Sequence, residues 1–126
     1  MKNNFKLFIG SAVAIIFSTH LQASECDLIK GEKIFTKCAA CHSLSPDKNL
    51  MGPSLHGLMN RKAGELESFK YSEAMQNSDI QWSTTQLDEF LLNPKKKIPG
   101  TSMPFSGLRN AKARAAVVCF IEQKTN

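Results

Sequence analysis

Residues 37–45 read KCAACHSLS, with two cysteines three positions apart and a histidine directly after the second. On a helix, Cys38, Cys41 and His42 stand at positions i, i+3 and i+4, so their side chains project from one face. A flat macrocycle lying against that face can take both sulfurs at its edge and the imidazole at its central metal. This is the geometry of C-x-x-C-H haem attachment, in which the cysteines form thioethers and the histidine binds iron.

Two other uses of paired cysteines fit the chain less well. A structural zinc site needs four protein ligands, usually from a second Cys or His pair, and beyond residue 23 the remaining candidates Cys26, His56 and Cys119 each stand alone. A thioredoxin-like dithiol needs a βαβ setting, and no stretch shows the sustained period-two alternation of a strand. The sequence therefore favours one covalently attached haem.

The sixth position of the iron decides between two kinds of function. An open position binds small ligands, as an enzyme or a gas sensor requires, whereas a methionine thioether closes it and raises the reduction potential, which suits electron transfer. Met103 stands in PGTSMPF between two prolines, so we expect it on a rigid loop that can hold its sulfur across from the histidine. We interpret the other methionines beyond residue 23 as apolar gap-filling side chains: Met51, Met59 and Met75.

Helical spacing of apolar residues recurs along the chain, and the expected fold class is all-α. A capping box at 24–27 predicts the start of a first helix, and a second capping box at 83–86 predicts a helix that ends at 93–94. Residues 72–77 predict a short helix. The apolar stripe after residue 110 predicts the last helix.

Dense glycine and proline predict two long loops, over residues 43–71 and 95–107. Loops of this length are uncommon in a compact domain unless something inside organises them. They therefore indicate a large buried ligand, in agreement with the C-x-x-C-H motif.

The first 23 residues have the pattern of a secretory signal peptide. Lys2 and Lys6 precede an apolar run of eleven residues (7–17), and LQA ends at Ala23. We expect cleavage after Ala23, which leaves one small domain over residues 24–126. The alternative is an uncleaved membrane anchor, although the run is short for crossing a bilayer.

The charge of the chain fits an acidic protein partner better than a nucleic acid. The full sequence carries a net charge of +5, and removal of Lys2 and Lys6 leaves 14 basic residues against 11 acidic ones, a net charge of +3. Nucleic acids call for a denser basic stripe. The run KKK at 95–97 fits either a solvated loop or a docking surface.

Four stretches together resemble class I cytochrome c of the mitochondrial and bacterial periplasmic type: GEKIFTKCAACH, GPSLHGLMNRKAG, YSEAMQNSDIQW and LLNPKKKIPGTSMPF. The resemblance covers almost the whole of residues 24–126, in order and at nearly constant spacing. It implies a small cytochrome c fold of about four to five short helices with long loops around one covalently bound haem c. It also implies an electron-transfer protein and not an enzyme.

The resemblance implies a role for each matching residue. Cys38 and Cys41 would carry the thioethers, and His42 and Met103 would be the axial iron ligands. The carbonyl of Pro53 would accept the other ring N–H of the histidine. Three residues would hydrogen-bond a haem propionate or offset its charge: Arg61, Tyr71 and Trp82. Thr101 would stiffen the methionine loop, and Gly31 and Phe120 would mark the crossing of the first and last helices.

The implied function is a periplasmic carrier that takes single electrons from a cytochrome bc complex to a terminal oxidase or similar acceptor in a respiratory chain. We expect a monomer without a stable membrane span after cleavage, which docks on acidic redox partners through lysines around the haem edge. The candidate lysines are Lys33, Lys37, Lys48, Lys62, Lys95, Lys96 and Lys97.

Cys26 and Cys119 are not part of the family pattern. They fall at the start of the predicted first helix and in the last helix, two places that the resemblance implies are close. A disulfide between them would form in an oxidising compartment if the Cα atoms can approach to about 5.5 Å. The alternatives are two small buried apolar residues, or a Cys26 that carries lipid or pairs between molecules.

Overall fold

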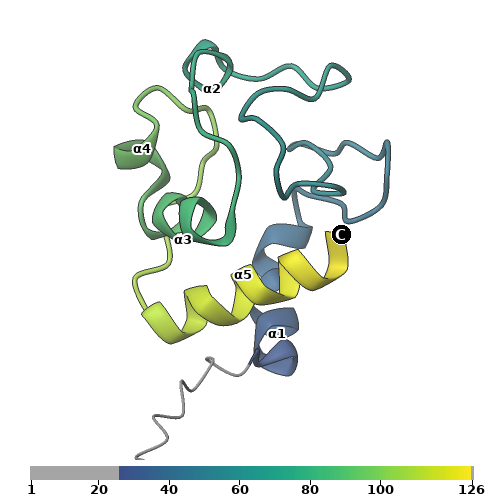
Figure 1. Ribbon diagram of the computed structural model, residues 1–126, viewed down its shortest axis with the longest axis vertical. Helices are drawn as coiled ribbons and strands as arrows, with labels where there is room; N and C mark the ends of the chain where they lie inside the picture. Colours follow the sequence, from purple (N-terminus) through teal and green to yellow (C-terminus); the bar gives the residue numbers. More distant parts are fainter. Residues whose placement is uncertain (1–25, 126) are drawn as a thin grey trace, which may run out of the picture.

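The computed structural model describes residues 26–125, which contain five α-helices and no β-strand. They are α1 (Leu28–Ala39), α2 (Glu73–Gln76), α3 (Thr84–Leu92), α4 (Pro94–Lys97) and α5 (Ala111–Thr125). In Figure 1, α1 and α5 cross at one end, α3 and α4 lie on one side, and the long segment between α1 and α2 lies on the other. The predicted all-α fold is therefore confirmed.

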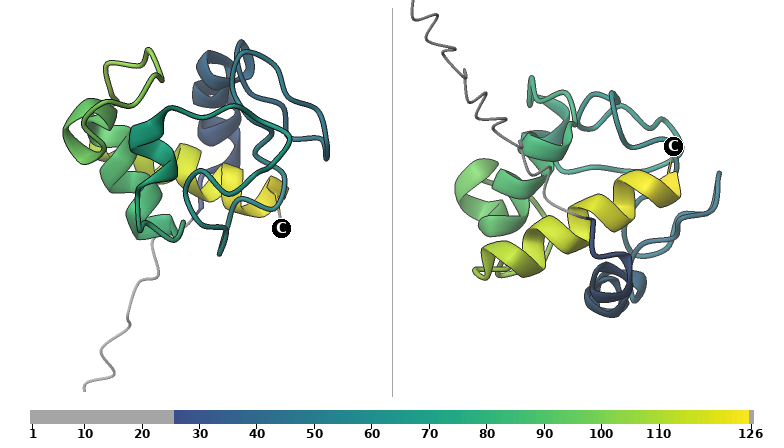
Figure 2. Two further views of the ribbon diagram at one scale, coloured as in Figure 1. Left: turned by 90° about the horizontal axis from the view of Figure 1, so that it is seen from above. Right: turned by 60° about the horizontal axis from the view of Figure 1, so that its bottom comes forward.

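The predicted signal peptide (1–23) lies outside the described residues. Within residues 26–125, no helix is long and apolar enough to cross a membrane. The two further views in Figure 2 show that α5 extends from the side of α3 to the loops that follow α1. The backbone N–H of Gly57 donates to the carbonyl of Thr125 at 2.8 Å, which ties the end of α5 to those loops.

Asp27 caps the first helix. Its carboxylate accepts a hydrogen bond from the backbone N–H of Lys30 at 2.9 Å, which satisfies one of the N–H groups that a helix start leaves without a partner. The capping box predicted at 24–27 was therefore wrong in its assignment, because Asp27 is the cap itself. Residues before Cys26 lie outside the described part of the chain.

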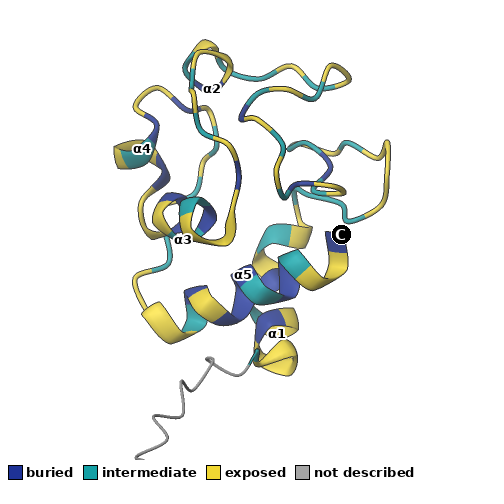
Figure 3. Cartoon of the chain, viewed as in Figure 1, coloured by how far each residue is buried: buried dark blue, intermediate teal, exposed yellow. Residues whose placement is uncertain are grey.

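The crossing of α1 and α5 is the centre of the apolar core, as the buried residues in Figure 3 show. Gly31 and Phe35 of α1 are buried there against α5, and the rings of Phe35 and Phe120 lie 5.3 Å apart between centroids. A Cβ atom at Gly31 would lie 2.6 Å from the Cβ of Phe120 and would also meet the carbonyl of Ala116. The predicted crossing at Gly31 and Phe120 is therefore confirmed.

We expect Gly31→Ala to lower the free energy of unfolding by about 1–3 kcal/mol, because the added methyl group forces two closely packed backbones apart. Guanidinium unfolding followed by far-UV circular dichroism measures this loss. Glu32→Ala is the comparison, since it introduces alanine at the exposed neighbouring position of the same helix. A Gly31→Ala protein as stable as the wild type would show that the crossing has room to spare.

A disulfide joins Cys26, just before α1, to Cys119 in α5. The two Cα atoms lie 5.9 Å apart, within the range that a disulfide spans without backbone movement. Of the alternatives considered for these cysteines, the structure therefore supports the intramolecular bridge. The bridge links the start of α1 directly to α5.

Asn93 separates α3 from α4. The cap of α3 is Ser83, whose hydroxyl accepts from the N–H of Gln86 at 3.2 Å. The side chain of Asn93 accepts from the N–H of Lys96 at 3.1 Å and so starts a one-turn helix with Pro94 in its first turn. The prediction of a loop over 95–107 was therefore wrong for its first three residues, because proline suits the first turn of a helix as well as a loop.

Candidate functional site

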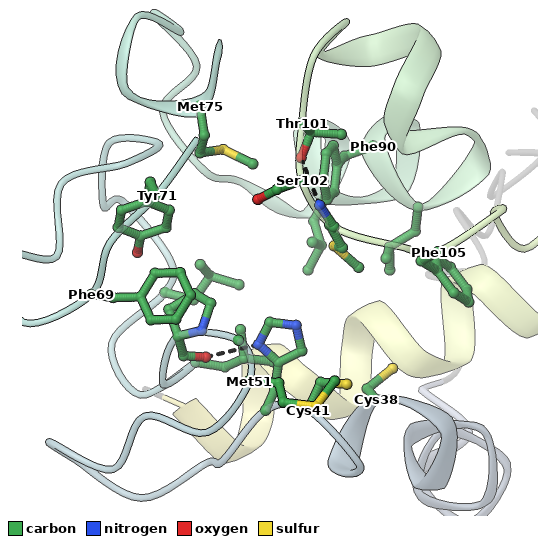
Figure 4. A pocket seen from close by; sticks show the side chains of 18 of the residues that line it. Cys38, Cys41, Met51, Phe69, Tyr71, Met75, Phe90, Thr101, Ser102 and Phe105 are labelled. Atoms are coloured by element: carbon green, nitrogen blue, oxygen red, sulfur yellow. Dashed lines mark hydrogen bonds between the residues drawn. The ribbon is translucent and has the colours of Figure 1, made fainter. Parts of the chain in front are cut away.

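A pocket of about 240 Å³ lies between the end of α1 and the segment that follows α4. All of the residues that the sequence analysis assigned to cofactor binding line it: Cys38, Cys41, His42, Pro53, Arg61, Tyr71, Trp82, Thr101 and Met103. In Figure 4, Cys38 and Cys41 lie on one side of the pocket, and Phe90, Thr101 and Ser102 lie on the other. Segments far apart in sequence thus meet at one site.

A tight turn at the end of α1 presents both thiols and the imidazole. The helix ends at Ala39, earlier than the sequence analysis assumed, but Ala40 keeps helical dihedral angles (φ −62°, ψ −28°). The backbone N–H groups of Cys41 and His42 both donate to the carbonyl of Cys38, at 3.0 and 2.9 Å. The turn therefore preserves the common face that a continuous helix would give.

The ring of His42 is fixed from two directions. Its Nδ1 donates to the carbonyl of Pro53 at 2.8 Å, the dashed bond in the lower part of Figure 4. A Cβ on Gly52 would lie 2.8 Å from both ring nitrogens, so the bare backbone of this glycine packs against the imidazole. With Nδ1 occupied as a donor, Nε2 carries the lone pair that can bind a metal.

Burial shifts the acid–base properties of this wall. Desolvation lowers the pKa of His42, and its hydrogen bond to Pro53 opposes the shift in part, so the neutral, metal-binding ring is favoured. Desolvation and the neighbouring Cys41 raise the pKa of Cys38, while Lys37 works in the opposite direction. Neither cysteine is in a disulfide, so both remain available for a covalent bond to a ligand.

Met103 stands on an irregular segment across the pocket. The hydroxyl of Thr101 accepts a hydrogen bond from the backbone N–H of Met103 at 3.4 Å. The carbonyl of Met103 accepts from the N–H of Phe105 at 2.9 Å, and the N–H of Thr101 donates to the carbonyl of Ile98 at 3.1 Å. Local hydrogen bonds therefore hold the segment that presents the thioether.

The other methionines lie in three different environments. Met75 is buried in α2 and lines the pocket. Met59 is partly buried and packs against the core. Met51 is 76% exposed at the pocket edge, so its interpretation as a gap-filling side chain was wrong.

The chemistry of the donor set fits a haem. The pocket combines two thiols, an imidazole and a thioether with apolar walls, which are the groups that attach and ligate haem in proteins. The apolar side chains of the walls include Leu55, Leu58, Leu87, Phe90, Leu91 and Ile121. Within residues 26–125, no three His, Cys, Asp or Glu side chains come together to hold a metal ion.

Comparison with known proteins identifies the family. The Cytochrome c family profile matches residues 28–124, which include every residue of the pocket. The chain belongs to the cytochrome c family. It is therefore an electron-transfer protein and not an enzyme, and it carries haem c bound covalently through Cys38 and Cys41.

Several cytochromes are similar over most of their length. Cytochrome c2 of Rhodoblastus acidophilus is 47% identical over 94 residues, 74% of this chain and 88% of that protein. Cytochrome c2 of Blastochloris viridis is 40% identical over 119 residues, 94% of this chain and 92% of the relative. In structure, cytochrome cH from Methylobacterium extorquens aligns with a TM-score of 0.72 and 37% identity, covering 77% of this chain and 98% of its own.

A polar group of residues completes the cytochrome pocket. Arg61 donates from one guanidinium nitrogen to the carbonyl of His56 and from the other to that of Ser54, both at 3.0 Å. Burial raises the pKa of Tyr71, and the nearby charge of Arg61 opposes this shift. Trp82 packs its ring edge to face with Phe90 at 5.2 Å. The cavity is thus lined by a guanidinium, a phenol and an indole, from Arg61, Tyr71 and Trp82.

Sequence reasoning missed two kinds of contact. The packing of Gly52 on the imidazole is one, because the sequence shows only a glycine before a proline. The other is the set of aromatic and apolar side chains that line the pocket from the predicted loops, such as Phe69 and Phe105 (Figure 4). No periodic pattern marks residues of this kind in irregular segments.

Proposed function

We propose that this cytochrome c is a periplasmic one-electron carrier whose haem iron is bound by His42 and Met103. One observation carries the proposal. The imidazole of His42 and the thioether of Met103 line a single pocket. Their neighbours in the sequence, Cys41 and Ser102, lie on opposite sides of this pocket in Figure 4. A nitrogen and a sulfur ligand together close the iron and favour its ferrous form.

The residues of the pocket keep both ligands in place. Pro53 and Gly52 fix the ring of His42, and the hydrogen bonds of Thr101 restrain Met103. The haem supplies an iron that changes between the ferric and ferrous forms by one electron. Because the protein groups that hold the ligands are already hydrogen-bonded, they need little rearrangement when the charge changes.

Arg61, Tyr71 and Trp82 would stabilise a haem propionate. A buried carboxylate is costly without partners. Arg61 uses two of its N–H groups on backbone carbonyls, which fixes the guanidinium beside the pocket and leaves further donors for an anion. The phenol of Tyr71 and the indole N–H of Trp82 are donors of the same kind.

Exposed lysines near the pocket support docking on acidic partners. Lys37 lines the pocket. Lys95 and Lys96 are exposed on α4, directly before the irregular segment 98–110 that carries Met103 (the Met103 segment). Two other candidates are engaged in ion pairs, Lys62 with Asp79 and Lys97 with Glu89. The partners that we propose are a cytochrome bc complex as donor and a terminal oxidase or similar acceptor.

Export to the periplasm rests on two features. Residues 1–23 have the order of a secretory signal peptide, which we propose is removed to leave a monomer of residues 24–126. The Cys26–Cys119 disulfide suits an oxidising compartment, because thiols are kept reduced in the cytosol. The intact mass of the protein isolated from cells distinguishes the processed form from an uncleaved anchor. The change in mass on reduction reports the disulfide.

The test is electron exchange between the purified protein and a purified cytochrome bc complex, followed by stopped-flow absorbance. We expect the bimolecular rate to fall by about tenfold as the salt concentration rises from low to physiological, because docking depends on opposite charges. The double variant Lys95→Glu/Lys96→Glu should be slower at low salt. Lys30→Glu/Lys112→Glu makes the same change in net charge at two exposed lysines of α1 and α5 that do not line the pocket, and serves as the control.

A rate that depends neither on salt nor on Lys95 and Lys96 would contradict docking at this surface. Ready binding of carbon monoxide by the ferrous wild-type protein at neutral pH would contradict the closed iron. The two results address different parts of the proposal, since docking and ligation are measured separately.

A further inference from the structure

Arg114 is a buried charged residue that lies outside the haem pocket. It is in the first half of α5 and only 8% exposed. A buried guanidinium is strongly destabilising unless its charge and its N–H groups find partners. The partners of Arg114 therefore show which parts of the fold this charge connects.

Three hydrogen bonds hold the guanidinium, each 3.0 Å long. Nε donates to the carboxylate of Asp88 in α3, and one terminal nitrogen donates to the carbonyls of both Leu108 and Arg109. The side chain of Asp88 is about one-third exposed, whereas that of Arg114 is 10% exposed. Arg114 thus connects three parts of the chain: α5, α3 and the end of the segment that carries Met103.

The same end of the segment is tied to α3 by backbone contacts. The N–H of Leu108 donates to the carbonyl of Leu91 at 2.7 Å. Gly107 has φ +104°, and a Cβ there would meet the carbonyl of Leu92. The chain therefore turns sharply at Gly107 against the end of α3, directly before the two carbonyls that Arg114 holds.

The α3 helix is also a wall of the haem pocket. Leu87, Phe90 and Leu91 line the cavity, and Asp88 follows Leu87 directly in the sequence. A group that holds the end of the Met103 segment to Asp88 therefore fixes the distance between that segment and the pocket wall. At its beginning, the segment is held by the hydrogen bond from Ile98 to Pro94.

We propose that Arg114, through Asp88, is a positioning residue for Met103. By holding the carbonyls of Leu108 and Arg109 against α3, it keeps the Met103 segment closed over the pocket and the thioether within reach of the iron. The inference rests on the proposed function, in which Met103 is the iron ligand.

The test is a titration of the ferric protein with imidazole, which competes with Met103 for the iron. Its apparent affinity is proportional to the fraction of molecules in which the thioether has left the metal. Hydrogen bonds to charged groups are among the stronger ones, so we expect Asp88→Asn and Arg114→Lys each to raise the apparent affinity by about tenfold. During the titration, the weak sulfur-to-iron band at the red end of the visible spectrum should disappear at an imidazole concentration about tenfold lower than in the wild type.

Two controls separate positioning from general stability. Asp79→Asn makes the same chemical change in an exposed ion pair with Lys62, at 3.6 Å, and should leave imidazole binding unchanged. Cys26→Ser/Cys119→Ser weakens the fold at the crossing of α1 and α5 without touching the Met103 segment. It should also bind imidazole as the wild type does.

The outcomes distinguish this inference from the proposed function. If the wild-type protein has the sulfur-to-iron band and the Arg114 and Asp88 variants bind imidazole with unchanged affinity, the positioning role is wrong. The same conclusion follows if the disulfide variant gains affinity to the same extent, since the effect is then one of global stability. A wild-type protein without the band contradicts Met103 ligation itself.

Discussion

Replacing Met103 by alanine should open the iron to external ligands and lower the reduction potential. Axial ligands span about 0.8 V of haem potential, and thioether ligation lies toward the high end, so we expect a fall on the order of 0.1 V or more. The sulfur-to-iron band should disappear from the ferric spectrum, and the ferrous protein should bind carbon monoxide. Spectroelectrochemistry and carbon monoxide titration measure these changes.

Met51→Ala is the matched control, because Met51 also lines the pocket but is 76% exposed at its edge. We expect its band, potential and carbon monoxide binding to match the wild type. If Met103→Ala keeps the band, another thioether binds the iron. Met75, the buried methionine of the pocket, would then be the first residue to replace.

Removing the disulfide should cost about 2–4 kcal/mol of the free energy of unfolding. The bond closes a loop with a sequence separation of 93 residues, and constraining so long a loop in the unfolded chain stabilises the native state by up to about 4 kcal/mol in the chain-entropy treatment. Guanidinium unfolding of Cys26→Ser/Cys119→Ser, followed by far-UV circular dichroism, measures the loss. The haem absorbance spectrum should not change, because the bond lies at the helix crossing.

The two single variants test whether the bond itself is responsible. Cys26→Ser and Cys119→Ser each break the same bridge, so either should lose nearly as much stability as the double variant. If the losses of the two single variants sum to the loss of the double variant, the effect comes from the two side chains separately and not from the bond. A double variant within about 0.5 kcal/mol of the wild type, the range of ordinary surface substitutions, would contradict a stabilising role.

Much of the site could be predicted from sequence because its chemistry is concentrated in a few short motifs. The C-x-x-C-H spacing and the methionine between two prolines each reflect a local constraint that allows few alternatives, whereas the role of Gly31 at the helix crossing was implied only by the family resemblance. The sequence was less informative where the same residue types are common in two kinds of structure. The turn at Pro94 is an example, because proline and lysines are common in both loops and first helical turns.

Tertiary contacts between distant residues explain most of what the sequence did not reveal. Arg114 binds Asp88, 26 positions away, and two backbone carbonyls in an irregular segment. No spacing rule connects such partners, and an arginine on an amphipathic helix ordinarily predicts an exposed face. The disulfide could be considered from the sequence, because the two cysteines lie outside the haem motif and the family resemblance implied that the first and last helices are close.

The most direct test of the account observes the methionine methyl groups of the reduced wild-type protein by NMR, with the methyl carbons labelled. A methyl group bound above the face of a haem is shifted far to high field by the ring current. We predict one such resonance, and it should be absent from Met103→Ala alone. If no methionine methyl is shifted, the proposed closed iron site is wrong. If the shifted resonance belongs to Met51, Met59 or Met75, the iron is closed by that residue and Met103 is not the ligand.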